Sequence, residues 1–259
     1  MLARARTAPA HTEGTAMAQD NEHPRSKGGS AYGRQISARR VRDLITSSIR
    51  DGHIAPDDPL AEEDLMLLFS TSRGSVRAAL TQLRDSGFVE RRRRVGTKVS
   101  HIGVSVPLTD INSDSNDILI TVIEEREVPN FPLVRERLAL DEPSLRMVEN
   151  TFSTAGEVIG IRTAYFSTRT LGDPRDLSGP VTMVDTITSF FGMTPGEVLV
   201  SIGSDIADAH TARVLGVAEG VPLIVREMTY FSSDGEPIQM VFDRFRGDRV
   251  RLEATDWTV

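Results

Sequence analysis

The chain has 259 residues, of which 39% are hydrophobic and 26% are charged, and its net charge is −7. This length and composition suit two ordinary globular domains, and the absence of cysteine excludes disulfides, thiolate metal sites and cysteine nucleophiles. Apolar runs are far shorter than the roughly 20 residues of a spanning helix, and no signal-peptide pattern is found, so we expect a cytoplasmic protein without a membrane partner.

Charge is distributed unevenly along the chain. Residues 25–101 contain 15 Lys and Arg against 9 Asp and Glu, a net charge of +6, whereas residues 102–259 contain 13 against 25, a net charge of −12. A short basic module is typical of nucleic-acid binding, while an acidic one is repelled by phosphate. The pattern indicates a basic binding module followed by an acidic domain with another role.

The N-terminal third is predicted to contain a tail and then three helices. Residues 1–33 have few large apolar side chains, which predicts a disordered tail. Apolar residues at helical spacing predict a first helix over residues 34–50 and a second, short one over residues 62–69. Ser72 can cap a third helix, which Gly87 ends.

Two short strands are predicted after the third helix, at residues 88–92 and 97–99, and an arginine-rich turn joins them. Three helices and a basic hairpin predict a winged helix-turn-helix over residues 34–101. A helix in the major groove presents its N-terminal side chains to the bases, and arginine can donate two hydrogen bonds to guanine. Arg73 and Arg77 are therefore the candidate base readers.

The hairpin arginines are candidates for phosphate or minor-groove contacts. An isolated pair of arginines such as Arg73 and Arg77 would more often form a solvated stripe, but the basic hairpin beside the helix favours DNA binding. The predicted DNA-binding residues are Ser72, Arg73, Ser75, Arg77, Arg92, Arg93, Arg94, Gly96 and Thr97.

A polar linker is predicted at residues 102–117, and a second domain at residues 118–259. Its turns at Gly156 and Gly235 each join two predicted strands, which indicates antiparallel hairpins. We therefore predict an α+β fold, with an antiparallel sheet and helices in the second domain. The predicted strands are residues 118–128, 145–152, 158–166, 197–202, 223–231 and 238–245, and the predicted helices are residues 133–140, 181–191 and 206–215.

Residues 60–65, LAEEDL, and residues 70–80, STSRGSVRAAL, resemble the signature of GntR-type regulators. The resemblance extends over about residues 36–100. It implies a winged helix whose dimers bind short palindromes. This sequence departs from the pattern at two places. Glu63 and Asp64 stand where many relatives have a further DNA-contacting arginine, and Arg94 stands where the hairpin often has its first glycine.

Residues 118–255 more loosely resemble the UTRA effector domain of HutC-type members of this family. The UTRA domain shares its fold with chorismate lyase. Its closing part is similar to residues 207–217, ADAHTARVLGV, and residues 234–238, DGEPI. The resemblance implies a cleft in which Arg162 and Gln239 replace acidic residues and Phe245 replaces a tyrosine. The predicted effector-binding residues are Arg146, Arg162, Tyr165, Gln239, Arg244 and Phe245.

Arg162 in a partly buried cleft would favour a carboxylate or phosphate effector, and the alternative is a salt bridge with an acid such as Glu149. Only His210 lies beyond His101, so no metal site is expected, and no catalytic motif or cofactor signature is found. These features predict a homodimeric, nucleoid-associated transcriptional repressor of double-stranded operator DNA, released by a small anionic effector. An enzyme of chorismate-lyase-like fold and a constitutive DNA-binding protein remain as alternatives.

Overall fold

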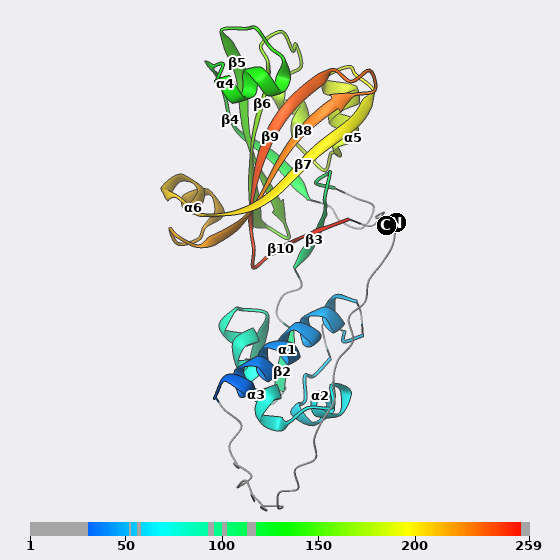
Figure 1. Ribbon diagram of the computed structural model, residues 1–259, viewed down its shortest axis with the longest axis vertical. Helices are drawn as coiled ribbons and strands as arrows, with labels where there is room; N and C mark the ends of the chain where they lie inside the picture. The colour runs from blue at the N-terminus through cyan, green and yellow to red at the C-terminus, as the bar shows by residue number, and fades with distance from the viewer. Residues whose placement is uncertain are drawn as a thin grey trace, which may run out of the picture.

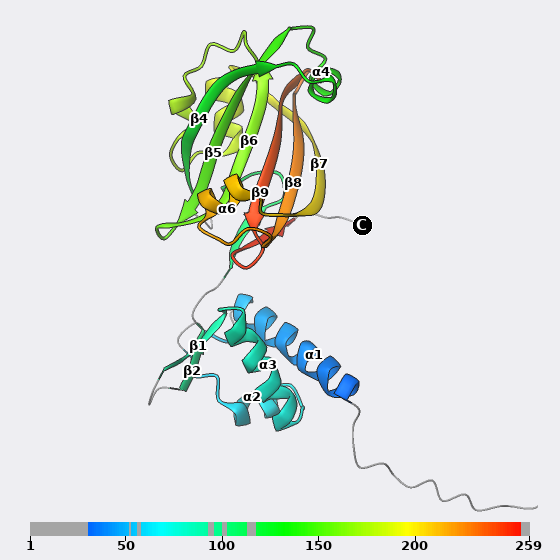
Figure 2. The same ribbon diagram turned by 90° about the vertical axis from the view of Figure 1, so that its left-hand side faces the viewer.

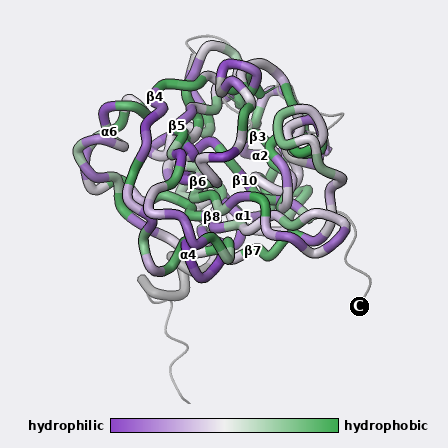
Figure 3. Tube along the Cα trace, turned by 90° about the horizontal axis from the view of Figure 1, so that it is seen from above, coloured by the Kyte–Doolittle hydropathy of each residue, from purple (hydrophilic) through white to green (hydrophobic). Residues whose placement is uncertain are grey.

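A computed structural model of the chain describes residues 31–51, 53–55, 58–92, 96–99, 103–112 and 118–254. The predicted tail, apart from its last three residues, lies outside the described residues. None of the described helices is both long and apolar enough to cross a membrane, and hydrophobic and hydrophilic stretches alternate along the trace (Figure 3).

The N-terminal domain consists of three helices and a hairpin (Figure 1). Apolar side chains from all three helices, including Ile45, Leu65, Val76 and Leu83, form one buried core, which the helical spacing in the sequence anticipated. The predicted winged helix-turn-helix is confirmed. Its elements are α1 (Ala31–Arg50), α2 (Glu62–Leu68), α3 (Arg73–Asp85) and the antiparallel strands β1 (Val89–Arg92) and β2 (Gly96–Val99).

The second domain is built on a six-stranded antiparallel sheet with the order β4-β5-β6-β9-β8-β7. The two predicted tight turns are present, and Gly156 and Gly235 both have positive φ angles, which favour glycine. The predicted α+β class is confirmed. The strands are β4 (Leu119–Pro129), β5 (Ser144–Thr154), β6 (Glu157–Ser167), β7 (Pro195–Ile206), β8 (Pro222–Ser232) and β9 (Pro237–Arg246).

Helical segments cover both faces of this sheet. On the face that we call the loop face, Phe166 packs among η1 (Pro174–Leu177), α5 (Met183–Asp185) and the π-helix η2 (Thr186–Phe190). On the opposite face, which we call the helix face, α4 (Pro132–Leu138) and α6 (Ala209–Leu215) lie near opposite ends of the strands (Figure 2). Because side chains alternate along a strand, neighbouring residues of one strand belong to different faces.

The predicted linker at residues 102–117 is wrong for residues 103–112, which are part of the second domain. Strand β3 (Val104–Pro107) pairs in parallel with β10 (Val250–Glu253), and Val106 and Ile111 are fully buried. Strands of four residues have too little periodicity to be recognised from sequence. Residues 113–117 lie outside the described residues.

The predicted helix at residues 206–215 begins three residues later than expected. Ile206 ends β7, and α6 begins at Ala209 after Asp208, whose carboxylate accepts a hydrogen bond of 2.7 Å from the backbone N–H of Thr211. A capping aspartate fixes the start of a helix because it satisfies a free N–H of the first turn. The apolar Ile206 therefore belongs to a strand, despite its helical spacing to Ala209.

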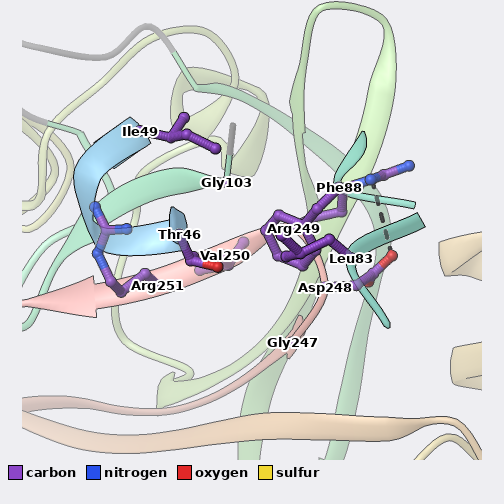
Figure 4. A pocket seen from close by; sticks show the side chains of 10 residues that line it. All are labelled: Thr46, Ile49, Leu83, Phe88, Gly103, Gly247, Asp248, Arg249, Val250 and Arg251. Atoms are coloured by element: carbon purple, nitrogen blue, oxygen red, sulfur yellow. Dashed lines mark ion pairs between the residues drawn. The ribbon is translucent and has the colours of Figure 1, made fainter. Parts of the chain in front are cut away.

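A cavity of about 250 Å³ lies between the two domains (Figure 4). Ile49, Leu83 and Phe88 of the N-terminal domain line one side of it. The other side is the turn between β9 and β10, where Arg249 Nε lies 3.9 Å from a carboxylate oxygen of Asp248. The two domains thus meet at an incompletely filled junction, apolar on one side and charged on the other.

Candidate DNA interface and effector site

Helix α3 has one buried face and one exposed face. Val76, Ala79 and Leu83 are buried in the core of the N-terminal domain. The side chains of Arg73 and Arg77 lie on the other face and are 56% and 70% exposed. The helical repeat of the apolar residues thus turns both predicted base-reading arginines outward.

Two of the predicted serines form the start of α3. Ser72 Oγ accepts a hydrogen bond of 3.2 Å from the backbone N–H of Ser75, and the two hydroxyl oxygens lie 2.9 Å apart. Such a cap stabilises a helix by about 1 kcal/mol. The other free N–H groups of the first turn, together with the helix dipole, suit a DNA phosphate.

Acidic residues of α2 pair with both arginines. Arg73 Nη2 donates to Glu63 Oε1 at 2.8 Å, and Arg77 Nε lies 3.4 Å from Glu62 Oε1. Exposed pairs of this kind contribute roughly 0.2–1 kcal/mol each, so DNA can replace them. Glu63, one of the departures from the family pattern, would therefore compete with DNA for Arg73 if this arginine reads bases as predicted.

We expect Glu63→Gln to strengthen binding to DNA by up to about fivefold, equivalent to about 1 kcal/mol. The substitution removes the 2.8 Å partner of Arg73, leaves only its longer 3.8 Å contact with Glu62, and removes a carboxylate that repels phosphate. Fluorescence anisotropy with the DNA upstream of the protein's own gene measures the change, and Glu136→Gln on the exposed side of α4 is a control of equal charge. Weaker binding by Glu63→Gln would contradict the competition.

A groove of about 320 Å³ lies between α3 and the β1–β2 hairpin. Arg77 and Arg84 line it from the helix, and Arg91 lines it from the hairpin. Arg91 belongs to the hairpin arginines considered for phosphate contacts, whereas Arg84 was not among the predicted DNA-binding residues. The seven-residue spacing from Arg77 to Arg84, which places both on one helix face, is the signal that could have identified Arg84.

The predicted hairpin residues are only partly described. Gly96 and Thr97 line the same groove, and Gly96 has a φ of +100°, which favours glycine. Arg93 and Arg94 lie outside the described residues, and the side chain of Arg92 is not described. The contact of these arginines with DNA therefore stays a prediction.

The six predicted effector residues do not form one site, because they lie on both faces of the sheet. Only Tyr165 and Arg244 belong to the helix face. The other four belong to the loop face: Arg146, Arg162, Gln239 and Phe245.

Arg162 is fully committed to Asp243 inside the domain. Its Nε and Nη2 donate to the two carboxylate oxygens at 2.6 and 3.0 Å, and Nε and Nη2 of the buried Arg226 donate to the same carboxylate at 2.9 and 2.6 Å. This corrects the expectation that Arg162 faces an open cleft. The alternative, a salt bridge between Arg162 and an acidic residue, is what the structure shows, but the acid is Asp243 and not Glu149.

The protonation of this buried group follows from its charges. Burial acts to raise the pKa of Asp243, but the two neighbouring guanidinium groups outweigh it and hold the pKa below its ordinary value. Burial likewise acts to lower the pKa of Arg162, and the attraction of Asp243 raises it instead. The three side chains are therefore a permanently charged unit at physiological pH.

The other three loop-face predictions are also engaged in packing. Arg146 Nη2 pairs with Glu125 at 2.6 Å, Gln239 is buried, and the ring of Phe245 stacks on Phe152 with centroids 5.7 Å apart. The structure therefore does not place them where an effector would have free access.

Tyr165 and Arg244 lie on the helix face, in the part of the sheet between α4 and α6. The ring of Tyr165 makes an edge contact with Phe242 at a centroid distance of 6.2 Å. Burial raises the pKa of Tyr165, and the charge of Arg244 opposes that rise. Arg244 is partly exposed, and its Nε lies 3.9 Å from the carboxylate of Asp205. This arginine can therefore accept a stronger anionic partner.

Helix α6 adds a histidine to the same face that sequence reasoning did not include. His210 Nε2 lies 2.7 Å from Glu149 Oε2, and Arg213 Nη2 lies 3.1 Å from His210 Nδ1. Because a guanidinium can only donate, Nδ1 accepts and the proton of the neutral ring lies on Nε2, facing Glu149. No set of three possible metal ligands gathers within the described part of the chain.

Two known families match the chain, one for each domain. Residues 37–99 match the family described as bacterial regulatory proteins, gntR family. Residues 118–251, more than half of the chain, match the UTRA domain.

Known proteins resemble the chain over most of its length. The HTH-type transcriptional repressor NagR of Bacillus subtilis is 20% identical over 219 residues, which are 81% of this chain and 90% of that protein. The HTH-type transcriptional regulator Rv0792c of Mycobacterium tuberculosis is 24% identical over 245 residues, which are 89% of this chain and 87% of that protein. The crystal structure of PhnF from Mycobacterium smegmatis has the same fold, with a TM-score of 0.59 and 22% identity over 85% of this chain and 100% of that one.

The matched family and both of these sequence relatives are transcriptional regulators, so the regulator interpretation holds over the enzyme alternative. The arginine face of α3, the hairpin beside it and the two matched domains lead to one identity. The chain belongs to the GntR family of bacterial transcriptional regulators, in the group whose C-terminal domain is a UTRA effector domain.

Proposed function

We propose that this protein is a repressor that binds a palindromic operator at the nucleoid as a homodimer, and that a small anionic effector releases it. The observation that carries the DNA-binding part is the exposed arginine face of α3 beside the hairpin groove. The relative NagR is named a repressor, which supports repression over activation.

The direct test is a titration of DNA from upstream of the protein's own gene, at about 50 and about 200 mM salt. We expect binding that exceeds binding to scrambled DNA, that weakens steeply with salt and that saturates at two chains per palindrome. Equal affinity for scrambled DNA would contradict sequence-specific regulation. Operator binding that no small molecule changes would instead indicate a constitutive DNA-binding protein.

The effector is proposed to bind the helix face between α4 and α6. Arg244 supports an anionic effector because it is partly exposed and its 3.9 Å contact with Asp205 is a weak one. Carboxylates and phosphates form shorter, charge-assisted hydrogen bonds with arginine. Tyr165 supplies an aromatic wall beside it, and the pair of His210 and Glu149 supplies polar groups from the α6 side.

A chain of contacts leads from the sheet toward the DNA-binding domain. Arg226 Nη1 donates to three backbone carbonyls within residues 107–110, at 2.5–3.1 Å, and the Tyr230 hydroxyl donates to a fourth at 3.0 Å. These residues are the last residue of β3 and the three that follow it, and β3 is the first strand after the N-terminal domain. A shift of the sheet strands on effector binding would therefore reach the segment that connects the domains, with a coupling on the order of 1–3 kcal/mol.

We expect Arg244→Ala to weaken the effector response by about tenfold or more, since a hydrogen bond to a charged group contributes about 1.5–3 kcal/mol. The measurement is the concentration of small carboxylates or phosphate esters that releases half of the bound operator DNA. Arg169→Ala, at an exposed arginine of the same domain, is the control. If Arg244→Ala leaves the release curve unchanged, the effector does not bind at Arg244.

A further inference from the structure

The two edge strands of the six-stranded sheet differ in chemistry. Strand β4, at one edge, carries four consecutive charged residues at 124–127, EERE, and its pairing with β5 shifts register between Val122 and Glu124. Charged side chains and irregular register are the usual protection of an edge strand against pairing with another chain. Ile120 also exchanges two backbone hydrogen bonds with Gly179, so part of this edge is covered by the chain itself. Strand β4 is therefore protected against pairing with another chain.

Strand β7, at the other edge, has this protection only near its ends, where its register with β8 shifts between Pro195 and Val198 and where Glu197 and Asp205 lie (Figure 2). Its residues 198–204, VLVSIGS, contain no charged side chain. The exposed fractions of Leu199, Ile202 and Ile206 are 44%, 52% and 64%. A long edge strand with exposed apolar side chains is a template for pairing with another strand.

Gly203 provides an independent observation on the same strand. A Cβ atom at this position would meet no heavy atom within 4 Å, and the φ angle lies outside the range that favours glycine. Glycine inside a strand is nevertheless less stable than alanine by about 0.5–1 kcal/mol. A glycine inside a strand marks a bulge, a tight bend or the close approach of a ligand or another backbone. The pairing of Gly203 with Val225 is regular, and its own chain leaves the space beside it open, so we infer the approach of a second backbone.

We propose that β7 pairs in antiparallel orientation with β7 of a second copy of this chain, around a two-fold axis near Ile202. This inference rests on the homodimer of the proposed function and names its surface. A strand that pairs with its own copy uses both exposed edges at once, so the assembly closes as a dimer. Pairing of β7 with β4 would instead leave a free edge at each end and continue into a fibre, and the charges of β4 oppose it.

The charges near the ends of β7 select the register. A two-fold axis perpendicular to the sheet keeps the same face of both copies on the same side. An axis at Ser201 would then place Glu197 opposite the partner's Asp205, and like charges directly opposite each other are destabilising. An axis at Ile202 separates these carboxylates, joins the two exposed Ile202 side chains and places Gly203 opposite the partner's Ser201.

The absence of cysteine from the chain allows a direct test with the full-length protein. We expect Ile202→Cys to form a disulfide-linked dimer on mild oxidation, because directly opposite residues of antiparallel strands approach to a Cβ separation of about 4.5 Å, which a disulfide can bridge. The matched control is Ile123→Cys on β4, whose side chain is 44% exposed. Non-reducing electrophoresis should show the dimer for the first variant and the single chain for the second.

Gly203→Glu gives a second readout that does not depend on oxidation. Its side chain meets open space in the single chain, so we expect an unchanged circular dichroism spectrum and a monomer mass by light scattering. Ile123→Glu should keep the wild-type mass. If the Gly203→Glu protein is a dimer and Ile202→Cys does not cross-link, the β7 interface is wrong but the dimer of the proposed function still stands. If the wild-type protein is a monomer, both are wrong.

Discussion

Replacement of Asp243 by alanine is expected to lower the free energy of unfolding by about 3–5 kcal/mol. The carboxylate accepts four hydrogen bonds of 2.6–3.0 Å from Arg162 and Arg226, and all three side chains are buried. Without it, two guanidinium groups would face each other in a water-poor core. Because a whole domain is stable by only about 5–15 kcal/mol, urea unfolding followed by circular dichroism should show a large loss.

The control for this effect is Asp205→Ala, which removes the exposed partner of Arg244. Its effect on the free energy of unfolding should stay within about 0.5 kcal/mol, and a loss equal to that of Asp243→Ala would contradict the special role of the buried unit.

The pKa of Asp243 is lowered in the folded state. The stabilisation by its carboxylate is therefore complete above the ordinary pKa of 3.8, and it is lost as the pH falls through the lower pKa of the folded state. Asp243→Asn removes the charge but keeps a side chain of similar size. The difference in free energy of unfolding between wild type and this variant should therefore be constant from about pH 7 to about pH 5 and become smaller only in stronger acid.

The double substitution Arg73→Ala/Arg77→Ala is expected to weaken operator binding by about 30-fold or more. Each arginine that makes two hydrogen bonds to guanine contributes roughly 1–3 kcal/mol of discrimination, and a loss of about 1.4 kcal/mol is tenfold. Both side chains are mostly exposed, so the fold should be unaffected. Anisotropy titrations with operator and scrambled DNA measure the loss, which should fall mainly on the operator.

A control with the same change in net charge separates base reading from general attraction to DNA. Arg169→Ala/Arg175→Ala removes two exposed arginines of the effector domain and should leave operator affinity nearly unchanged. An equal loss in both double variants would mean that the chain's overall charge governs binding, and α3 would lose its role as the reading helix. Neither arginine lies near β7, so the proposed β7 dimer should persist in the Arg73→Ala/Arg77→Ala protein.

The parts of the fold with a strong local signal could be predicted from the sequence. The stripe of Val76 and Leu83 on α3, the capping serine Ser72 and the turns at Gly156 and Gly235 all rest on neighbouring residues. The pairing of β3 with β10 joins segments about 146 residues apart, and four residues of strand carry no usable periodicity.

The effector site could be predicted only in part, because its definition depends on sheet register. Arg162 and Thr163 are neighbours on β6, yet the first lies on the loop face and the second on the helix face. An error of one residue in the register therefore assigns a side chain to the wrong face. The partner of Arg162 lies 81 residues further along the chain, on β9. No local pattern identifies that pairing, so the sequence could place an arginine on β6 but could not show whether it meets a ligand or a buried aspartate.

The parallel pairing of β3 with β10 makes the last described strand part of the connection between the two domains. The strand that leaves the N-terminal domain is held by residues 250–253, which come about 146 residues later in the chain. A stop codon or frameshift shortly before Val250 would therefore remove the partner of β3 and leave the DNA-binding domain itself unchanged. Such truncated proteins would still compete for operators, so late nonsense alleles of this gene should behave as partly dominant, effector-blind regulators.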